Sequence, residues 1–294
     1  MKYVWIREHC DQFPVKTMCR VLGVSTSGYY AARKRRVGPR ALRSQRIRDH
    51  VVRVYQSSNQ IYGSYKIAKE LRKDSELESA CRNTVARAMN ELGLKSRVSR
   101  RFRPATTVAD PTGKPAENIL DQNFKANAPN VKWVTDITYL PVAGGWVYLA
   151  VVLDLFSRRI VGWALSESLA TPLVSRALRT AIEQRRPVTR DLLLHSDRGC
   201  QYTSEEYQGQ LKTMSITCSM SRTGCCYDNA VAERFFWSLK QEWLNFRELA
   251  DLEAARHCVF EYIELFYNTK RIHQTLGYQS PKQFEENHYA KLSA

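Results

Sequence analysis

The sequence predicts an α/β protein in which a mixed β-sheet covered by helices follows an all-helical amino-terminal region. Three observations support this fold class. The first hundred residues show helical periodicity, three consecutive strand patterns follow from residue 131, and strands then alternate with helices. This order of patterns is typical of a mixed sheet with helical layers. The chain has 294 residues, enough for about two domains.

The helical region contains two similar helical pairs. In the first pair, Gly23 breaks a helix and Ser25 can cap the next one. The second pair repeats this plan in "YGSYKIAKELR" and "CRNTVARAMNELGLK". Both pairs fit helix-turn-helix geometry, in which the second helix presents side chains to the major groove of DNA. We therefore expect two helix-turn-helix units, at residues 1–55 and 56–98. Because many helical pairs never contact DNA, this pattern alone does not establish DNA binding.

The basic charge is concentrated in this helical region. The formal net charge is +16, and residues 1–110 hold 24 of the 45 Lys and Arg but 9 of the 29 Asp and Glu. Such a local excess is the pattern expected of a protein that binds the phosphate backbone, although a solubilising surface is the alternative. The first unit ends in a basic run, which supplies the candidate DNA-binding residues Arg33, Lys34, Arg35 and Arg36.

Several other classes of protein are disfavoured. The eight cysteines form no CxxC pair, which argues against a structural zinc site. The amino terminus does not read as a signal peptide. The longest apolar stretch, "WVYLAVVLDLF", is about half the length that a bilayer requires and contains Asp154. We therefore expect a cytoplasmic protein with reduced thiols and no membrane segment.

The remaining elements follow in order. Residues 99–130 lack apolar periodicity, carry four prolines and predict a linker. Residues 131–290 predict the core with a carboxy-terminal helical extension. Strand patterns occur in "VKWVTDITYL", twice in "GGWVYLAVVLDLFSRRIVGWALSE", in "DLLLHSD" and in "ITCSMS". Helical patterns occur in "PLVSRALRTAIEQRR", "SEEYQGQLKTM", "AVAERFFWSLKQEWL" and "LEAARHCVFEYIELFYN".

Three acidic residues are candidates for a shared site. Asp136 lies inside the first strand, Asp197 ends the fourth, and Glu233 lies on the helix that Asp228 or Asn229 could cap. If the fourth strand pairs beside the first, the two aspartates become neighbours. Three hard oxygen donors in one place favour Mg²⁺ or Mn²⁺, and two such ions about 4 Å apart catalyse phosphodiester chemistry. Some three of the 29 acidic residues will always fit a chosen spacing, so the spacing alone is weak evidence. The hypothesis of a metal site rests on the placement of these three acids on a strand, a strand end and a helix, together with the basic amino-terminal region.

The motifs resemble a known family. The segments "WVTDITYL", "HSDRGCQYTS", "SRTGCCYDNAVAERFFWSLK" and "YNTKRIHQTLGYQSPKQF" are similar, in this order, to the integrase-core transposases of the bacterial insertion sequence 3 family, the product of its second reading frame. The helical front resembles that family's helix-turn-helix region. The resemblance covers nearly the whole chain and implies an RNase H-like fold. Cys200 and Cys225 stand where serine and a polar residue such as asparagine are expected.

The resemblance also implies function. Asp136, Asp197 and Glu233 would form a metal-binding catalytic triad, and Lys240, seven residues after Glu233, would help to hold terminal DNA. The activity would be strand cleavage at the element's ends, followed by attack of the freed 3′ hydroxyl on target DNA. The implied partners are DNA and the first-reading-frame protein, and catalysis across two ends implies a multimer on DNA.

Alternatives remain at this point. We interpret Asp154 as a turn residue and His195 as a packing residue rather than a base. Four aromatic residues are assigned mainly to the core: Trp133, Tyr139, Tyr202 and Trp237. A catalytically inactive DNA-binding regulator or host-adopted relic, or a nuclease that hydrolyses without joining, would share the same architecture.

Overall fold

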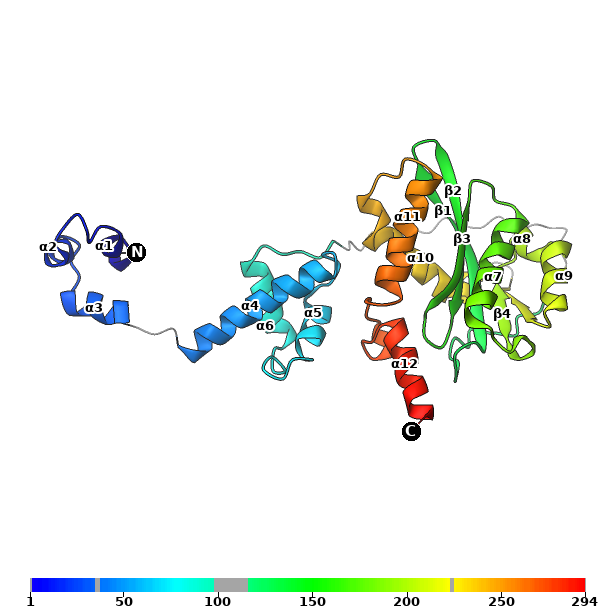
Figure 1. Cartoon of the computed structure of the whole chain (residues 1–294), viewed down its shortest axis with the longest axis horizontal. Helices are drawn as coiled ribbons and strands as arrows, with labels where there is room; N and C mark the ends of the chain where they lie inside the picture. Colours follow the sequence, from blue (N-terminus) through cyan, green and yellow to red (C-terminus); the bar gives the residue numbers. More distant parts are fainter. Residues whose placement is uncertain (1, 35–37, 98–115, 223–224, 294) are drawn as a thin grey trace.

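The computed structural model describes residues 2–34, 38–97, 116–222 and 225–293. Along the chain, these residues form an amino-terminal helical cluster, a second helical unit and a mixed α/β core (Figure 1). Among the helices that the structure describes, none combines the length and apolarity that crossing a membrane requires.

The first helical cluster has a small core of its own. It consists of α1 (Lys2–Glu8), α2 (Val15–Val21) and α3 (Thr26–Lys34). After α2, Gly23 adopts a left-handed backbone with φ of 63°, and Ser25 Oγ accepts a hydrogen bond from the backbone N of Gly28 at 2.9 Å. The helix break and the cap predicted from these residues are therefore confirmed.

The second helical unit is built on a long helix. It consists of α4 (Pro39–Ser57), α5 (Ser64–Leu71) and α6 (Arg82–Glu91). The apolar face of α4 belongs to the same core cluster as residues of α5 and α6, and α4 contacts both helices. The expected boundary at residue 55 thus falls inside a helix that packs on the second pair.

This unit also contacts the α/β core. The Tyr62 hydroxyl, which lies just before α5, donates to the carbonyl of Lys270 at 3.1 Å and accepts from the backbone N of Ile272 at 2.8 Å. Tyr62 is buried and belongs to a core cluster that extends into the α/β domain. These two bonds join residues more than 200 positions apart in the chain.

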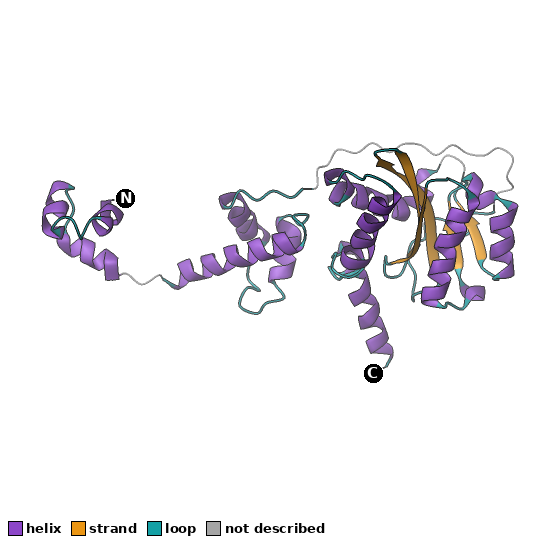
Figure 2. Ribbon diagram, turned by 45° about the horizontal axis from the view of Figure 1, so that its top comes forward, coloured by secondary structure: helices purple, strands orange, loops and turns teal. Residues whose placement is uncertain are grey.

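The strands form a mixed sheet (Figure 2). It has five strands in the order β3-β2-β1-β4-β5. β1 pairs antiparallel with β2, and β2 with β3, while β4 pairs parallel with both β1 and β5. The fourth strand pairs beside the first, which is the condition under which the two aspartates were expected to become neighbours. The strand bounds are Lys132–Val142 for β1, Gly145–Asp154 for β2, Ile160–Ser166 for β3, Leu193–Ser196 for β4 and Thr217–Met220 for β5.

Helices cover both faces of this sheet (Figure 1). Because side chains alternate along a strand, Trp133 of β1 packs in the cluster under α7 and α9, whereas its neighbour Val134 packs in the cluster under α10 and α11. Helix α7 approaches closely at Gly162 of β3, where an added Cβ would lie 2.3 Å from the carbonyl oxygen of Ala177. The bounds are Thr171–Arg185 for α7, Cys200–Thr203 for α8, Glu205–Thr213 for α9, Ala230–Glu242 for α10 and Leu252–Phe260 for α11.

The remaining helical segments are short or terminal. A π-helical stretch, Glu261–Tyr267, continues α11, and the carboxy-terminal helix is α12 (Pro281–Leu292). Single 3₁₀ turns lie at Thr189–Asp191, Cys226–Asn229, Leu244–Phe246 and Gln274–Leu276.

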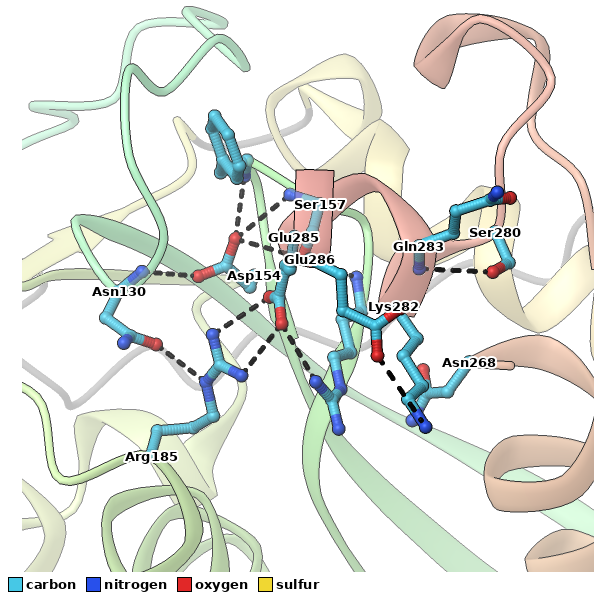
Figure 3. A network of polar contacts seen from close by, with 12 residues as sticks. Asn130, Asp154, Ser157, Arg185, Asn268, Ser280, Lys282, Gln283, Glu285 and Glu286 are labelled. Atoms are coloured by element: carbon cyan, nitrogen blue, oxygen red, sulfur yellow. Dashed lines mark hydrogen bonds and ion pairs between the residues drawn. The ribbon is translucent and has the colours of Figure 1, made fainter. Parts of the chain in front are cut away.

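Helix α12 is anchored by a buried carboxylate (Figure 3). Glu285 forms a bidentate pair with Arg185 of α7 at 2.9 Å and a second pair with Arg159 at 2.8 Å, and it accepts from Ser157 at 2.7 Å. Nearby, Asp154 accepts hydrogen bonds from backbone N–H groups of the turn that follows β2, at 2.8 and 3.1 Å. Its interpretation as a turn residue is confirmed.

We expect Glu285→Gln to lower the free energy of unfolding by about 3 kcal/mol, because breaking a buried ion pair leaves Arg185 without its counter-charge. The matched control is Glu286→Gln on the next residue of α12, whose pair with Lys282 is exposed (Figure 3) and contributes about 0.5 kcal/mol or less. Urea unfolding followed by tryptophan fluorescence measures both values. Equal effects in the two variants would contradict this account of how α12 is held.

Candidate active site

Two aspartates meet where β4 ends. In the parallel pairing of β1 with β4, Val134 lies opposite His195. Asp136 and Asp197 each lie two residues beyond this pair, so both follow the same end of the β1–β4 ladder. β4 ends at Ser196, so Asp197 is the first residue of the loop that follows. The end of a strand beside a loop is where the open α/β sheet leaves room for a substrate.

The third acid comes from the helix that covers this face. Asp136 has the same strand parity as Val134, which packs toward α10, and Glu233 lies in the first turn of α10. Burial raises the pKa of Asp136, and the negative charges of Asp197 and Glu233 raise it further. The pKa of Glu233 is likewise raised by burial and by Asp197. The three carboxylates are therefore close enough to repel one another.

The carboxylates do not form a closed cage. Within the part of the chain that the structure describes, no three carboxylate, imidazole or thiol groups are close enough to enclose a metal ion. Asp136 and Asp197 are half-buried, whereas Glu233 is exposed. Since an exposed side chain changes rotamer at low cost, Glu233 is the member of the trio that is free to adjust.

The first turn of α10 is fixed directly to β1. Asn229 Nδ2 donates to the carbonyl of Thr135 at 3.3 Å, beside Asp136. The side chains of Asp228 and Asn229, which were expected to cap the helix, bind other groups instead: Asn229 occupies the N-cap position and bonds β1, and Asp228 bonds the loop described below. This tie holds Glu233 near the strand that carries Asp136.

Lys240 lies at the same site. It is half-buried, two helical turns after Glu233, and its Nζ lies 4.6 Å from the centroid of the Tyr139 ring. The positive charge of Lys240 lowers the pKa of Asp136, and burial lowers the pKa of Lys240 itself. The structure thus brings Lys240 to the carboxylates, on the face that its spacing from Glu233 predicted.

His195 is a buried structural residue beside the site. Its Nδ1 lies 2.9 Å from Ser219 Oγ and its Nε2 lies 3.2 Å from Ser221 Oγ. Burial lowers the pKa of His195 to about 4, so the ring is neutral at physiological pH. The same Ser219 Oγ accepts from the backbone N of Ile119 and of Leu120, at 2.9 and 3.0 Å. A segment of the expected linker is therefore bonded to the strands beside Asp197.

Asp228 binds the same linker segment on its other side. This fully buried carboxylate accepts from Asn118 Nδ2 at 2.8 Å, from Gln122 Nε2 at 2.9 Å and from the backbone N of Arg222 at 2.9 Å. We call residues 118–122 the clip, because they join Ser219 of β5 to the loop before Glu233. Sequence reasoning missed the clip; the adjacent acid and amide at 228 and 229 were noticed only as possible caps.

The other sequence candidates have mixed outcomes. Trp133 and Tyr202 are buried as expected, but Tyr139 is 43% exposed, so its assignment to the core was wrong. Cys225 is accommodated in the loop, where its Sγ donates to Asp228 at 3.3 Å.

Of the basic run, Arg33 is exposed on α3 and Lys34 is the last residue of α3. Arg35 and Arg36 lie outside the described residues.

Comparisons with known proteins agree with this architecture. Two models of an integrase core domain match residues 126–226 and 214–281, and a model of a helix-turn-helix-like domain matches residues 43–102. With the mixed sheet, these matches define an enzyme of the integrase-core class, a polynucleotidyl transferase with an RNase H-like fold and DNA-binding helical units. The predicted fold class is confirmed.

Relatives identify the family more narrowly. Transposase InsF for insertion sequence IS3A of Escherichia coli is 43% identical over 99% of this chain and 100% of its own length. A 31 kDa protein of insertion element IS600 from Shigella sonnei is 36% identical over 92% of this chain and 98% of its own length. The chain belongs to the insertion sequence 3 family of transposases, as its motifs indicated.

Solved structures also resemble the chain. The magnesium complex of the HTLV-2 integrase catalytic core domain is 18% identical and matches 54% of this chain and 98% of its own, with a TM-score of 0.42. The simian T-cell lymphotropic virus intasome structure is 15% identical and matches 80% of this chain and 74% of its own, with a TM-score of 0.44.

In a chelating buffer we expect Asp136→Asn to raise the midpoint of thermal unfolding by a few degrees, because it removes one of three repelling charges. The matched control is Asp154→Asn, which should lower the midpoint. Both oxygens of Asp154 accept from N–H donors, so an amide NH₂ meets a donor whichever way it is turned. A decrease of similar size in both variants would show that Asp136 is not under electrostatic strain.

Asp228→Asn should lower the free energy of unfolding at pH 7 by about 2–3 kcal/mol, the value of lost hydrogen bonds to a buried charge. Hydrogen bonds from Arg222 hold the pKa of Asp228 well below its usual value. The stabilisation is therefore present above the unfolded pKa, about 4, and declines as the pH falls further. Urea unfolding at several pH values measures this difference.

The control for Asp228 is Asp121→Asn, because Asp121 pairs with the same Arg222 at 3.2 Å but is exposed. We expect that variant to change the free energy of unfolding by about 0.5 kcal/mol or less at every pH. A deficit in Asp228→Asn that stays constant down to pH 3 would contradict the account.

Proposed function

We propose that Asp136, Asp197 and Glu233 are the catalytic carboxylates of this transposase and that they hold divalent cations, Mg²⁺ or Mn²⁺, against the DNA backbone. The single observation that supports this best is the placement of three carboxylates at one site, from β1, the end of β4 and the first turn of α10, where the charges of Asp197 and Glu233 raise the pKa of Asp136. Like charges gathered at one site are destabilising, and a bound cation relieves the repulsion. All three donors are hard oxygen ligands, which fit magnesium and manganese.

Two bound ions would activate the attacking water or 3′ hydroxyl and stabilise the leaving oxygen. The chain's own contribution is positioning. Asp136 lies on β1 and Asp197 directly follows the adjacent strand β4, and each accepts a backbone N–H at 2.8 to 3.0 Å, from Ile137 and Gly199 respectively. Glu233 approaches on a helix that Asn229 ties to β1. In this proposal Lys240 attracts the phosphate that lies next to the carboxylates.

DNA binding by the helical units completes the proposal. The basic residues Arg33, Lys34, Arg35 and Arg36 would contact phosphates after the first helical pair. We place residues 39–97 in one unit, because α4 packs on α5 and α6. The chain would act in the cytoplasm as a multimer on paired element ends, together with the first-reading-frame protein or as a fusion with it.

We expect Asp197→Asn to abolish nicked and joined products when labelled element ends are incubated with the full chain in Mg²⁺. Loss of one metal-binding carboxylate should lower the rate by at least about a thousandfold, and chelator should abolish the wild-type reaction. The matched control is Asp191→Asn, because Asp191 lies just before β4 and is exposed. Gel analysis of the products measures all four reactions.

Each alternative function has its own outcome in this assay. Joining that persists in Asp197→Asn would remove Asp197 from the site. Binding without any cleavage by wild type would support the catalytically inactive regulator, and cleavage without joining would support a hydrolytic nuclease.

A further inference from the structure

Two exposed aromatic side chains lie near the turn of the β1–β2 hairpin. Tyr139 of β1 and Trp146 of β2 meet edge to face, with ring centroids 5.0 Å apart, and are 43% and 52% exposed. The next residue on each strand, Leu140 or Val147, is fully buried. The hairpin therefore has one face in the core and presents two large rings on its other face. The two rings contact each other on the surface, and neither belongs to a core cluster of the described residues.

The surface is rigid before any ligand binds. Tyr139 lies opposite Tyr148, and Pro141 lies opposite Trp146, so the β1–β2 ladder sets the spacing of the two rings. Just beyond this pair, the backbone N of Ala143 donates to the carbonyl of Leu249 at 2.9 Å, which fixes the turn to the body of the core. Rings that are already held in place lose little conformational entropy when a flat ligand stacks on them.

The charge beside the rings points to the kind of ligand. The ammonium group of Lys240 lies 4.6 Å from the centre of the Tyr139 ring and also acts on the carboxylate of Asp136. A strand of DNA alternates a negative phosphate with a flat base, which matches a cation followed by two aromatic rings. A buried protein interface fits less well, because lysine is depleted at the centre of such interfaces.

We propose that Tyr139 and Trp146 form a stacking surface for an unpaired base of the DNA strand that the carboxylates hold. This inference rests on the proposed function and adds the state of the DNA to it. Bases inside a duplex are already stacked on their neighbours, so only a frayed, extruded or single-stranded nucleotide can use the rings. The surface would thus favour DNA whose end is open over DNA whose end is fully paired.

The test compares two DNAs that share one duplex sequence, one blunt and one with a short single-stranded 3′ tail that contains 2-aminopurine. Binding to the full chain is measured in a chelating buffer, so that no cleavage takes place. We expect wild type to bind the tailed DNA about fivefold or more tightly than the blunt DNA, the value of about one stacked base, and to quench the 2-aminopurine fluorescence. The double variant Tyr139→Ala/Trp146→Ala should bind both DNAs equally.

Two controls keep the result specific. Tyr139→Phe/Trp146→Phe keeps both rings and should retain the preference for the tail. Tyr289→Ala removes a ring that is 48% exposed on α12 and should also retain it. The helix-turn-helix units contact the duplex part in both DNAs, so their contribution cancels in the ratio.

A tail preference that survives in Tyr139→Ala/Trp146→Ala would overturn the proposal. If that variant also changes its oligomeric state by light scattering without DNA while the preference stays intact, the rings instead contact another copy of the chain. The binding ratio needs no catalysis, so a failure of the Asp197→Asn prediction would refute the proposed function and leave this ratio unchanged.

Discussion

Electrostatic repulsion among Asp136, Asp197 and Glu233 is the constraint on which the rest of the core depends. Bringing three carboxylates together at the end of a sheet opposes folding, because each raises the free energy of ionising the next. Their positions must therefore be imposed by bonds that the carboxylates themselves do not supply. The β1–β4 ladder, the bond from Asn229 to β1 and the clip at residues 118–122 supply them. A cation therefore binds most favourably where the protein leaves negative charge uncompensated.

The other buried acids of the core show the contrast. Glu242 at the end of α10 is paired with Arg271 at 2.6 and 2.7 Å, and Glu285 is paired with two arginines. Arg271 lowers the pKa of Glu242 against the effect of burial. Compensated acids thus fasten α10 and α12. Asp154 is also buried, and four N–H donors compensate it in place of an arginine. A carboxylate that lies beside other carboxylates without such compensation is a functional signal.

Sequence patterns identified what depends on local periodicity. The strand containing Asp136, the short strand ending before Asp197 and the helix of Glu233 all carry patterns of apolar residues, so these elements could be predicted. The clip could not, because Asn118 and Asp228 are 110 positions apart and their hydrogen bond leaves no periodic trace. Tyr139 occupies a position of the strand pattern that is typical of a core residue. Its ring is exposed because the helices that cover the sheet do not extend over it.

The contacts between the second helical unit and the core connect DNA binding to the catalytic helix. Tyr62, just before α5, bonds the backbone of Lys270 and Ile272, the two residues on either side of Arg271. Arg271 in turn holds Ser238 and Glu242 on α10, about one and a half and two and a half turns after Glu233. A displacement of α5 is therefore transmitted to α10, the helix that carries Glu233, through the Tyr62 hydroxyl and the Arg271 guanidinium group. Because these bonds are buried, moving either end without the other would leave charged or polar groups unpaired, which is the physical basis for the two units to move together.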